Sequence, residues 1–209
     1  MKKQKSKKPT ESLEMKTAFT LETGIDFSNR TIYLFGGIDT EVAYRFFVAF
    51  QAMDKSGQWI RVVLNSPGGD EHAGFAIYEL IKHSNSPVLM DAYGCVFSMA
   101  PMIMQAATVR RMSPECRFMV HCGSVGLTSD VETNTFVSMG HELGYINKRY
   151  SDIIGLKAKR PKEEVTLLCN KESYMSAEDA LKWGFIDSVI QTGSDIEVSI
   201  KRVKPKKAK

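Results

Sequence analysis

Hydrophobic residues along the chain switch between two spacings, which predict strands and helices in turn. Short apolar runs, several of them closed by glycine or proline, predict strands. These strands are expected at residues 31–35, 60–65, 88–93, 109–112, 117–121, 185–190 and 196–200. The turn residues Gly36-Gly37, Ser66-Pro67-Gly68-Gly69 and Gly94 are expected to end the first three of them.

Helical spacing appears between the predicted strands. Residues 40–53 place Val42, Phe46 and Phe50 four apart, and residues 73–81 repeat apolar side chains along one helix face. An apolar segment at 98–107 predicts a buried helix, and Ser176 with Asp179 forms a capping box for a helix over 177–183. Alternation of strand and helix about every 30 residues favours an α/β fold with a mainly parallel sheet.

One long segment, residues 131–154, has a narrower apolar stripe than the other helices. Its apolar residues are spaced 3, 4, 3, 4 and 3 apart, which is an a/d pattern of about three heptads: Phe136, Met139, Leu143, Ile146, Tyr150 and Ile153. Such a stripe suits pairing with one other helix. Spacing alone leaves open whether that helix belongs to the same domain or to another subunit.

Composition is that of an ordinary globular protein, with 209 residues of which 43% are hydrophobic. We expect a single domain over residues 18–200, between a flexible basic segment at 1–17 and a basic tail at 201–209. No run of about 18 apolar residues and no secretory signal is present, so we expect a cytoplasmic protein without membrane contact.

The net charge of +4 comes from the two ends. Residues 1–8 carry five Lys and residues 201–209 carry six Lys or Arg, so the remainder has 17 basic and 24 acidic residues, a balance of −7. This distribution gives no sign of specific nucleic-acid binding. The four cysteines form no C-x-x-C pair and have no histidine at metal-ligand spacing, so we expect reduced thiols and no metal site.

Two junctions could carry chemistry. At Asn65–Gly69 a strand gives way to a helix, and the paired glycines either serve the turn alone or leave N–H groups free for a ligand. At residues 94–100, Ser98 lies at a strand-to-helix junction, where it is either a nucleophile on a sharp turn or the cap of the helix. A nucleophile needs a base, and His121, at the end of a strand, is the best placed of the four histidines. A Cys122–His121 pair is not expected, because neighbouring strand residues point to opposite faces.

Five motifs in order resemble one family. They are N-S-P-G-G at 65–69, A-G with I-Y at 73–78, G-x-x-x-S-M-A at 94–100, F-M-V-H at 118–121 and Y-M-S-A-E-D-A-L-K-W-G-F-I-D at 174–187. The set resembles the proteolytic subunit of the Clp-type ATP-dependent protease, over roughly residues 30–190. The resemblance implies a crotonase-like α/β spiral of βαβ units with a protruding handle helix, at about residues 123–170.

The resemblance also implies a site and an assembly. Ser98 would be the nucleophile, His121 the general base, and the N–H groups of Gly69 and Met99 the oxyanion hole, without a cofactor or metal. Peptide binding would involve Gly68, Gly69 and Gly123. The family forms stacked rings, commonly two heptamers, around a chamber, and a hexameric AAA+ unfoldase ATPase feeds it unfolded polypeptide.

The sequence departs from the family pattern at three places. The position of the family's triad aspartate holds Glu172, so the expected triad is Ser98, His121 and Glu172, and the Asp-Arg pair that helps rings to stack is Glu172-Ser173. The loop 122–129 and the residues before Arg30 are also unlike the family. Alternatives are a non-catalytic ring subunit, a phage-type maturation protease or signal-peptide-peptidase relative, and a crotonase-type acyl-CoA enzyme.

Overall fold

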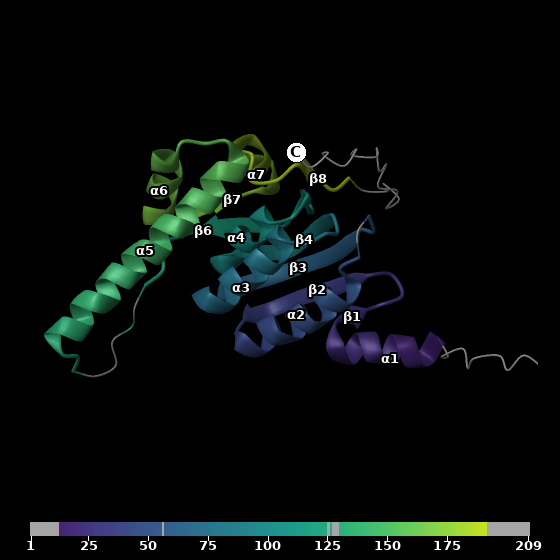
Figure 1. Ribbon diagram of the computed structural model, residues 1–209. Helices are drawn as coiled ribbons and strands as arrows, with labels where there is room; N and C mark the ends of the chain where they lie inside the picture. The colour runs from purple at the N-terminus through teal and green to yellow at the C-terminus, as the bar shows by residue number, and fades with distance from the viewer. Residues whose placement is uncertain (1–12, 56, 125, 127–129, 192–209) are drawn as a thin grey trace, which may run out of the picture.

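The computed structural model describes residues 13–55, 57–124, 126 and 130–191, and in this part of the chain eight strands form one mixed, mostly parallel sheet (Figure 1). The main order is β1-β2-β3-β4-β5-β8, and β6 pairs with β4 and with β7. The predicted α/β class with a mainly parallel sheet is confirmed. The strands are β1 Ile25–Asp26, β2 Thr31–Ile38, β3 Ile60–Gly69, β4 Val88–Phe97, β5 Val109–Met112, β6 Arg117–Val120, β7 Ser173–Met175 and β8 Ser188–Val189.

Helices occur at each place where the apolar spacing or the capping box predicts one, and the described residues form two further helices, at 13–23 and 162–170, that were not predicted. Helix α2 has the predicted bounds, and the predicted capping box at Ser176 and Asp179 starts α7, which Gly184 ends in a left-handed conformation. The helices are α1 Leu13–Thr23, α2 Thr40–Met53, α3 Glu71–Lys82, α4 Met99–Gln105, α5 Thr133–Ala158, α6 Lys162–Asn170 and α7 Ala177–Trp183.

The core lies between the central strands and the helices α2, α3 and α4. Phe50 of α2, Leu64 of β3, Met90 of β4 and Ile103 of α4 are all fully buried. Burying side chains of this size contributes about 1.5–3 kcal/mol each. The same core fixes the ends of β3 and β4, where the candidate site lies.

Three central strands are longer than predicted. β2 continues through Gly36-Gly37 to Ile38, β3 continues through Ser66–Gly69, and β4 continues past Gly94 to Phe97. The prediction that these residues end the strands is wrong, because pairing between neighbours overrides the local turn preference. Gly37 pairs with Gly68, and the irregular register at this level accommodates the proline and glycines.

A bend in β4 uses the asparagine of the 65–69 motif. Gly94 has φ of +67°, and a Cβ there would lie 2.7 Å from the Asn65 Oδ1 atom. The same oxygen accepts a hydrogen bond of 3.2 Å from the Cys95 N–H. Before the bend β4 pairs with β5, and after it β4 pairs with β6. The bend therefore brings β6 and its following residue, His121, alongside the end of β4.

The two ends of the described chain differ from the sequence predictions. α1 begins at Leu13, inside the segment 1–17 that was expected to be flexible. Of the strand predicted at 185–190, only Ser188–Val189 is extended and paired, while Phe185 and Ile186 are buried core residues. The strand predicted at 196–200 and the basic tail at 201–209 lie outside the described residues.

Helix α5 extends away from the sheet toward the lower left of Figure 1. It has 26 residues and overlaps the long helix predicted at 131–154, beginning two residues later and ending four residues later. Its C-terminal half packs on the core through buried Tyr150 and Ile154, whereas Phe136 and Val137 near its start are 55% and 48% exposed. The apolar stripe is therefore covered at one end and open at the other.

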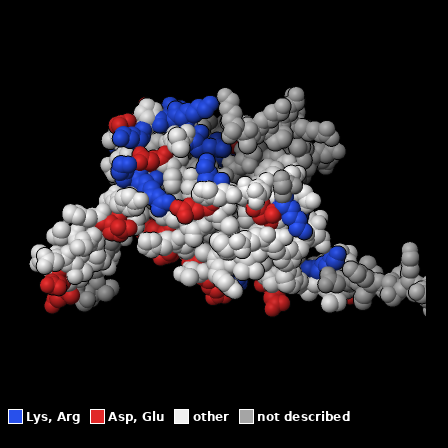
Figure 2. Space-filling view, in the orientation of Figure 1, with Lys and Arg blue, Asp and Glu red and all other residues white. Residues whose placement is uncertain are grey.

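Basic side chains gather on one part of the surface, with some acidic side chains among them (Figure 2). Figure 2 shows Lys and Arg gathered over α6 and the end of α5, and Asp and Glu along the lower edge near α2 and at the start of α5. The basic region contains Lys157, Lys159, Arg160 and Lys162. Arg160 lies 3.8 Å from the Glu164 carboxylate, so part of this charge is compensated locally. The net charge of −7 for the body did not predict this local gathering of basic side chains.

Candidate active site

Ser98 lies between β4 and α4 in a conformation that few residues other than glycine adopt. Its φ is 58° and its ψ is −111°, and its side chain makes no capping hydrogen bond to α4. The interpretation of Ser98 as a helix cap is therefore wrong. Backbone strain of this kind costs about 1–3 kcal/mol and persists where the surrounding structure holds it in place.

Neighbouring elements hold this turn from several sides. The Ser98 N–H donates to the Met119 carbonyl of β6 at 3.1 Å, and the Tyr150 hydroxyl of α5 donates to the Ser98 carbonyl at 2.7 Å. Behind the serine, Gly68 at the end of β3 is so close that a Cβ on it would overlap the Ser98 Cβ. The turn is thus fixed by β3, β6 and α5 together.

His121, the first residue after β6, faces the serine. Its Nε2 atom lies 2.8 Å from the Ser98 Oγ atom. When the imidazole is neutral with its proton on Nδ1, the serine hydroxyl donates this bond and Nε2 is ready to take the proton. The next residue, Cys122, donates instead to the Asn170 side chain at 3.1 Å. The expectation that Cys122 does not pair with His121 is confirmed.

A cavity of about 190 Å³ opens in front of this pair. It contains both residues predicted for an oxyanion hole, Gly69 and Met99, beside the serine and the histidine. Its lining consists of Gly69, Glu71, Ser98, Met99, His121, Gly123, Ser124, Ile146, Asn147 and Tyr150. The site therefore combines the ends of β3, β4 and β6 with the start of α3 and the middle of α5.

The two other glycines expected to bind peptide have different environments. Gly68 does not line the cavity, and its N–H donates to the Ser66 hydroxyl at 3.1 Å. Gly123 does line it, but the Asn147 amide of α5 pairs with its backbone: the Gly123 N–H donates at 2.7 Å, and its carbonyl accepts at 3.5 Å. The Asn147 side chain thus forms hydrogen bonds with both backbone groups of Gly123. The sequence did not predict this contact.

Glu172, expected as the third member of a triad, does not bond to His121 in the structure. Its Oε1 atom accepts a hydrogen bond of 3.1 Å from the Tyr174 hydroxyl, and its side chain is exposed. The strand register nevertheless places both residues next to paired positions. Val120 pairs with Ser173 in the antiparallel ladder of β6 and β7, so His121 directly follows and Glu172 directly precedes this pair of residues.

The cysteines of the described chain are all free thiols, as expected. Burial raises the pKa of Cys116 and of Cys169 to about 12, and burial also raises the pKa of Cys95 and of Cys122. Thiols with raised pKa values are poor nucleophiles at neutral pH. Within the described residues no group of three or more His, Cys, Asp or Glu side chains is arranged to hold a metal ion.

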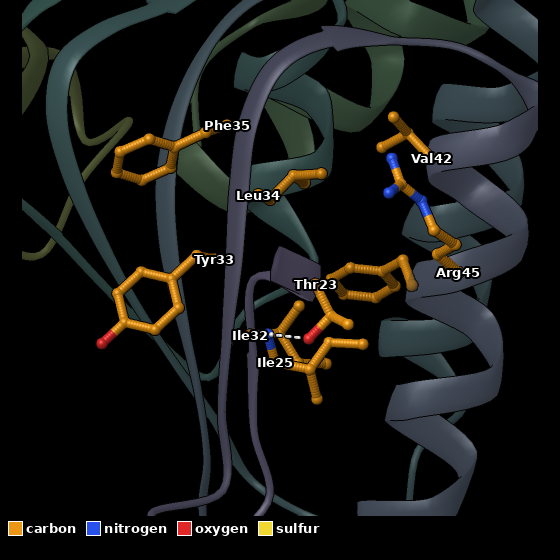
Figure 3. Close-up of a pocket in the computed structure, with 9 residues that line it drawn as sticks. Thr23, Ile25, Ile32, Tyr33, Leu34, Phe35, Val42 and Arg45 are labelled. Atoms are coloured by element: carbon orange, nitrogen blue, oxygen red, sulfur yellow. Dashed lines mark hydrogen bonds between the residues drawn. The ribbon is translucent and has the colours of Figure 1, made fainter. Parts of the chain in front are cut away.

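A second cavity, between β2 and α2, has a different character. It measures about 60 Å³ and is lined mainly by apolar residues such as Ile32, Leu34 and Phe46 (Figure 3). Figure 3 shows Tyr33 and Phe35 on the opposite side of β2, pointing away from α2. The cavity holds neither a nucleophile nor a base, so the pair at Ser98 remains the candidate site. No helix of the described residues is both long and apolar enough to span a bilayer.

The site thus has a serine on a strained strand-to-helix turn, in hydrogen-bond contact with a histidine and directly before the first residue of a helix. The sequence matches the protein-family model described as Clp protease over residues 20–193. That range covers most of the chain and includes every residue of the candidate site. The chain therefore belongs to the Clp protease family.

Curated relatives are similar to this chain over most of its length. ATP-dependent Clp protease proteolytic subunit 3 of Rhizobium etli is 28% identical over 176 residues, which are 81% of this chain and 88% of the relative. ATP-dependent Clp protease proteolytic subunit 2 of Thermobifida fusca is 30% identical over 80% of this chain and 83% of the relative. The proteolytic subunit of Deinococcus radiodurans is 29% identical over 78% of this chain and 80% of its own.

Proposed function

We propose that this chain is a serine endopeptidase that cleaves unfolded polypeptides or peptides through an acyl-enzyme intermediate. The observation that carries the proposal is the 2.8 Å contact between Ser98 Oγ and His121 Nε2 at a serine with φ of 58°. A serine that only capped its helix would need neither the strained turn nor a histidine partner. Membership of the Clp protease family supports the same conclusion.

The reaction would begin with attack of Ser98 Oγ on the carbonyl carbon of the peptide bond, while His121 Nε2 takes the hydroxyl proton. When the tetrahedral intermediate collapses, the C–N bond breaks and the amine leaves with the proton from His121. Water then attacks the Ser98 ester in the same way, with His121 as base, and releases the acid. Neither a cofactor nor a metal is needed for these steps.

The oxyanion of the intermediate would be bound by the N–H groups of Gly69 and Met99, two residues that line the cavity together with the serine. Met99 is the first residue of α4, so its N–H has no partner within that helix. Fixed N–H donors at the position of the developing charge are commonly worth about 3–4 kcal/mol of transition-state stabilisation. Gly69 and Gly123, which line the cavity, are the backbone positions that would flank a bound peptide, whereas Gly68 lies behind the serine.

Glu172 is proposed as the group that orients His121 after a change of side-chain rotamer. Support comes from the register of β6 and β7, because the two residues adjoin the paired residues Val120 and Ser173. The bond from Tyr174 to Glu172 would have to break first. On this proposal the isolated chain holds the nucleophile and base in contact but leaves the third residue unengaged.

We also propose the family's assembly: a homo-oligomer of stacked rings, with heptamers as the expected size, in the cytoplasm. α5 would act as the handle within a crotonase-like spiral, since its exposed apolar start is suited to pairing with another subunit. The relatives are named as subunits of ATP-dependent Clp proteases, so a hexameric AAA+ unfoldase is the proposed partner.

Intact-mass spectrometry after treatment with a fluorophosphonate tests the chemistry. The Ser98 oxygen would form a bond to phosphorus and fluoride would leave, so a single adduct is expected on the natural chain and none on Ser98→Ala. Glu172→Gln is expected to slow labelling if the glutamate orients His121. Absence of an adduct on the assembled protein would contradict the proposed activity.

A second candidate function is that of a ring subunit without catalytic activity, which would shape or regulate an active paralogue. The contact of Glu172 with Tyr174 favours this alternative, because it leaves His121 without an acidic partner among the described residues. The two candidates differ in the labelling experiment: a non-catalytic subunit would assemble into rings and take no adduct.

A further inference from the structure

One acidic side chain lies inside the catalytic cavity. Glu71 begins α3, two residues after Gly69, and lines the cavity together with Ser98 and His121. Its Oε1 atom lies 3.2 Å from the position that a Cβ of Gly123 would take, so the carboxylate is close to the loop on the far side of the serine. It is the one carboxylate among the ten described residues that line this cavity.

The Glu71 carboxylate has no partner within the described part of the chain. The hydrogen bonds and ion pairs of these residues include none with its side chain, and the α3 capping bond comes from Asp70 instead. The basic side chains of α5 near the cavity are already engaged: Lys148 with Asp152 at 2.6 Å, and Arg149 with Glu79.

The remaining lining suits the stem of a long cationic side chain. Met99, Ile146 and Tyr150 provide apolar surface in the same cavity, and Glu71 provides a negative charge. Lysine and arginine combine an aliphatic stem with a charged head, so they can use both features at once. A carboxylate partly removed from water and left unpaired gains most from such a cation.

We propose that Glu71 makes the catalytic cavity selective for a peptide with lysine or arginine as the residue whose carbonyl is attacked. The proposal rests on the proposed peptidase function of Ser98 and His121. A competing explanation is that Glu71 only stabilises the start of α3 through the helix dipole. That role would change stability and would affect all substrates equally.

A pair of peptides that differ only at this residue, arginine or its neutral isostere citrulline, separates the two explanations. We expect the natural chain to cleave the arginine peptide with kcat/KM about tenfold higher, the size of effect that one charge pair in a partly buried site supplies. Glu71→Gln should remove the difference, and Glu71→Lys should reverse it for a glutamate peptide. Glu178→Gln is the matched control, because Glu178 occupies the first turn of α7 and is exposed outside the cavity.

A binding measurement tests the role of Glu71 without requiring peptide cleavage. In a Ser98→Ala background, fluorescence anisotropy should show tighter binding of the arginine peptide than of the citrulline peptide, and adding Glu71→Gln should equalise them. Equal binding and equal cleavage of both peptides by the natural chain would overturn the role of Glu71. Selective binding without cleavage by the natural chain would support Glu71 and overturn the peptidase activity instead.

Discussion

The Tyr150 hydroxyl donates a hydrogen bond of 2.7 Å to the carbonyl oxygen of Ser98 and so links α5 directly to the strained turn. Tyr150 is 4% exposed, and burial raises the pKa of its hydroxyl well above the ordinary value of 10.0. The group therefore stays a neutral donor at any working pH. Because the start of the same helix is exposed and apolar, contacts made there by another subunit would act on a helix that holds the serine in place.

Tyr150→Phe removes this donor and keeps the ring. The Ser98 carbonyl would lose its buried partner, which costs about 1–3 kcal/mol, and the serine would be less firmly placed. We expect kcat/KM for peptide cleavage to fall roughly tenfold or more, since small misplacement of reacting groups has effects of this size. Tyr145→Phe is the control, because Tyr145 is 58% exposed on the same helix. Equal activity of the two variants would contradict a positioning role for Tyr150.

Gly68→Ala should disrupt the site from the opposite side. Gly68 has φ of +93°, and a Cβ there would overlap the Ser98 side chain and lie 2.8 Å from the Phe97 carbonyl oxygen. Overpacking and an unfavourable φ together suggest a loss of about 2–4 kcal/mol in the free energy of unfolding. Fluorophosphonate labelling should be lost as well.

The control for this change is Gly37→Ala. Gly37 pairs with Gly68 across β2 and β3, but its Cβ would meet no atom within 4 Å. Chemical denaturation followed by circular dichroism measures both variants. Similar stability of the two would show that close packing against Ser98 is not what requires glycine at position 68.

How far the sequence predicted the fold depends on which interactions decide each feature. The apolar spacing of 40–53 gave the bounds of α2, because that pattern reflects burial of one helix face. The S-P-G-G motif predicted a turn where β3 in fact continues to Gly69, because the decisive contacts are with Ile38 and its neighbours on β2. Local propensity carries no information about such partners.

The candidate site divides in the same way. Residue types alone did not decide whether Ser98 is a nucleophile or a helix cap. The family resemblance favoured a nucleophile with His121 as its base, and the structure places the two side chains in contact. Two contacts at the site could not be predicted from any motif. One is the hydrogen bond between Tyr174 and Glu172, and the other is the pairing of the Asn147 side chain with the backbone of Gly123. The first depends on the rotamers of two side chains, and the second on how α5 packs beside the residues that follow β6.

Acid should weaken the fold through Asp187. Burial raises the pKa of this carboxylate, but hydrogen bonds and charge from Arg110 outweigh burial, so the pKa lies below the ordinary 3.8. Arg110 is 3% exposed and donates to Asp187 at 2.6 and 3.0 Å. With a folded pKa below the unfolded one, the stabilisation is present above about pH 4 and disappears as pH falls through the folded pKa.

Asp187→Asn should therefore lower the free energy of unfolding at pH 6 and have a smaller effect at pH 3. Urea denaturation at several pH values measures the difference. Asp152→Asn serves as the control, since Asp152 pairs with the exposed Lys148 within one helix and such pairs contribute little. A difference from the natural chain that did not shrink toward low pH would contradict the ionic role of Asp187.

Assembly is expected to depend on the exposed start of α5. Phe136 is 55% exposed and lies on the heptad stripe, so Phe136→Glu would place a charge in any interface formed there while leaving the packed half of the helix intact. We expect the sedimentation coefficient to fall to that of a smaller species. Ser138→Glu, an exposed change outside the stripe, is the control. Equal sedimentation of the two variants would count against pairing of subunits through this stripe.

Tyr174→Phe tests whether the contact with Tyr174 restrains Glu172. The substitution removes the hydroxyl that donates to Glu172 and keeps the ring, which packs edge-on against Phe97 with centroids 5.6 Å apart. If Glu172 orients His121 once it is released, fluorophosphonate labelling of Ser98 should accelerate by about two- to fivefold, the equivalent of one exposed hydrogen bond. Tyr44→Phe on α2 is the control, since Tyr44 is 69% exposed.

The double variant Glu172→Gln with Tyr174→Phe completes the comparison. If the two residues act through one another, the acceleration from Tyr174→Phe should vanish in the Glu172→Gln background, which a double-mutant cycle measures directly. The same acceleration in both backgrounds would mean that Tyr174 affects labelling without Glu172. Slower labelling in Tyr174→Phe alone would mean that the hydrogen bond supports the active arrangement, because the tyrosine would then hold Glu172 where His121 needs it.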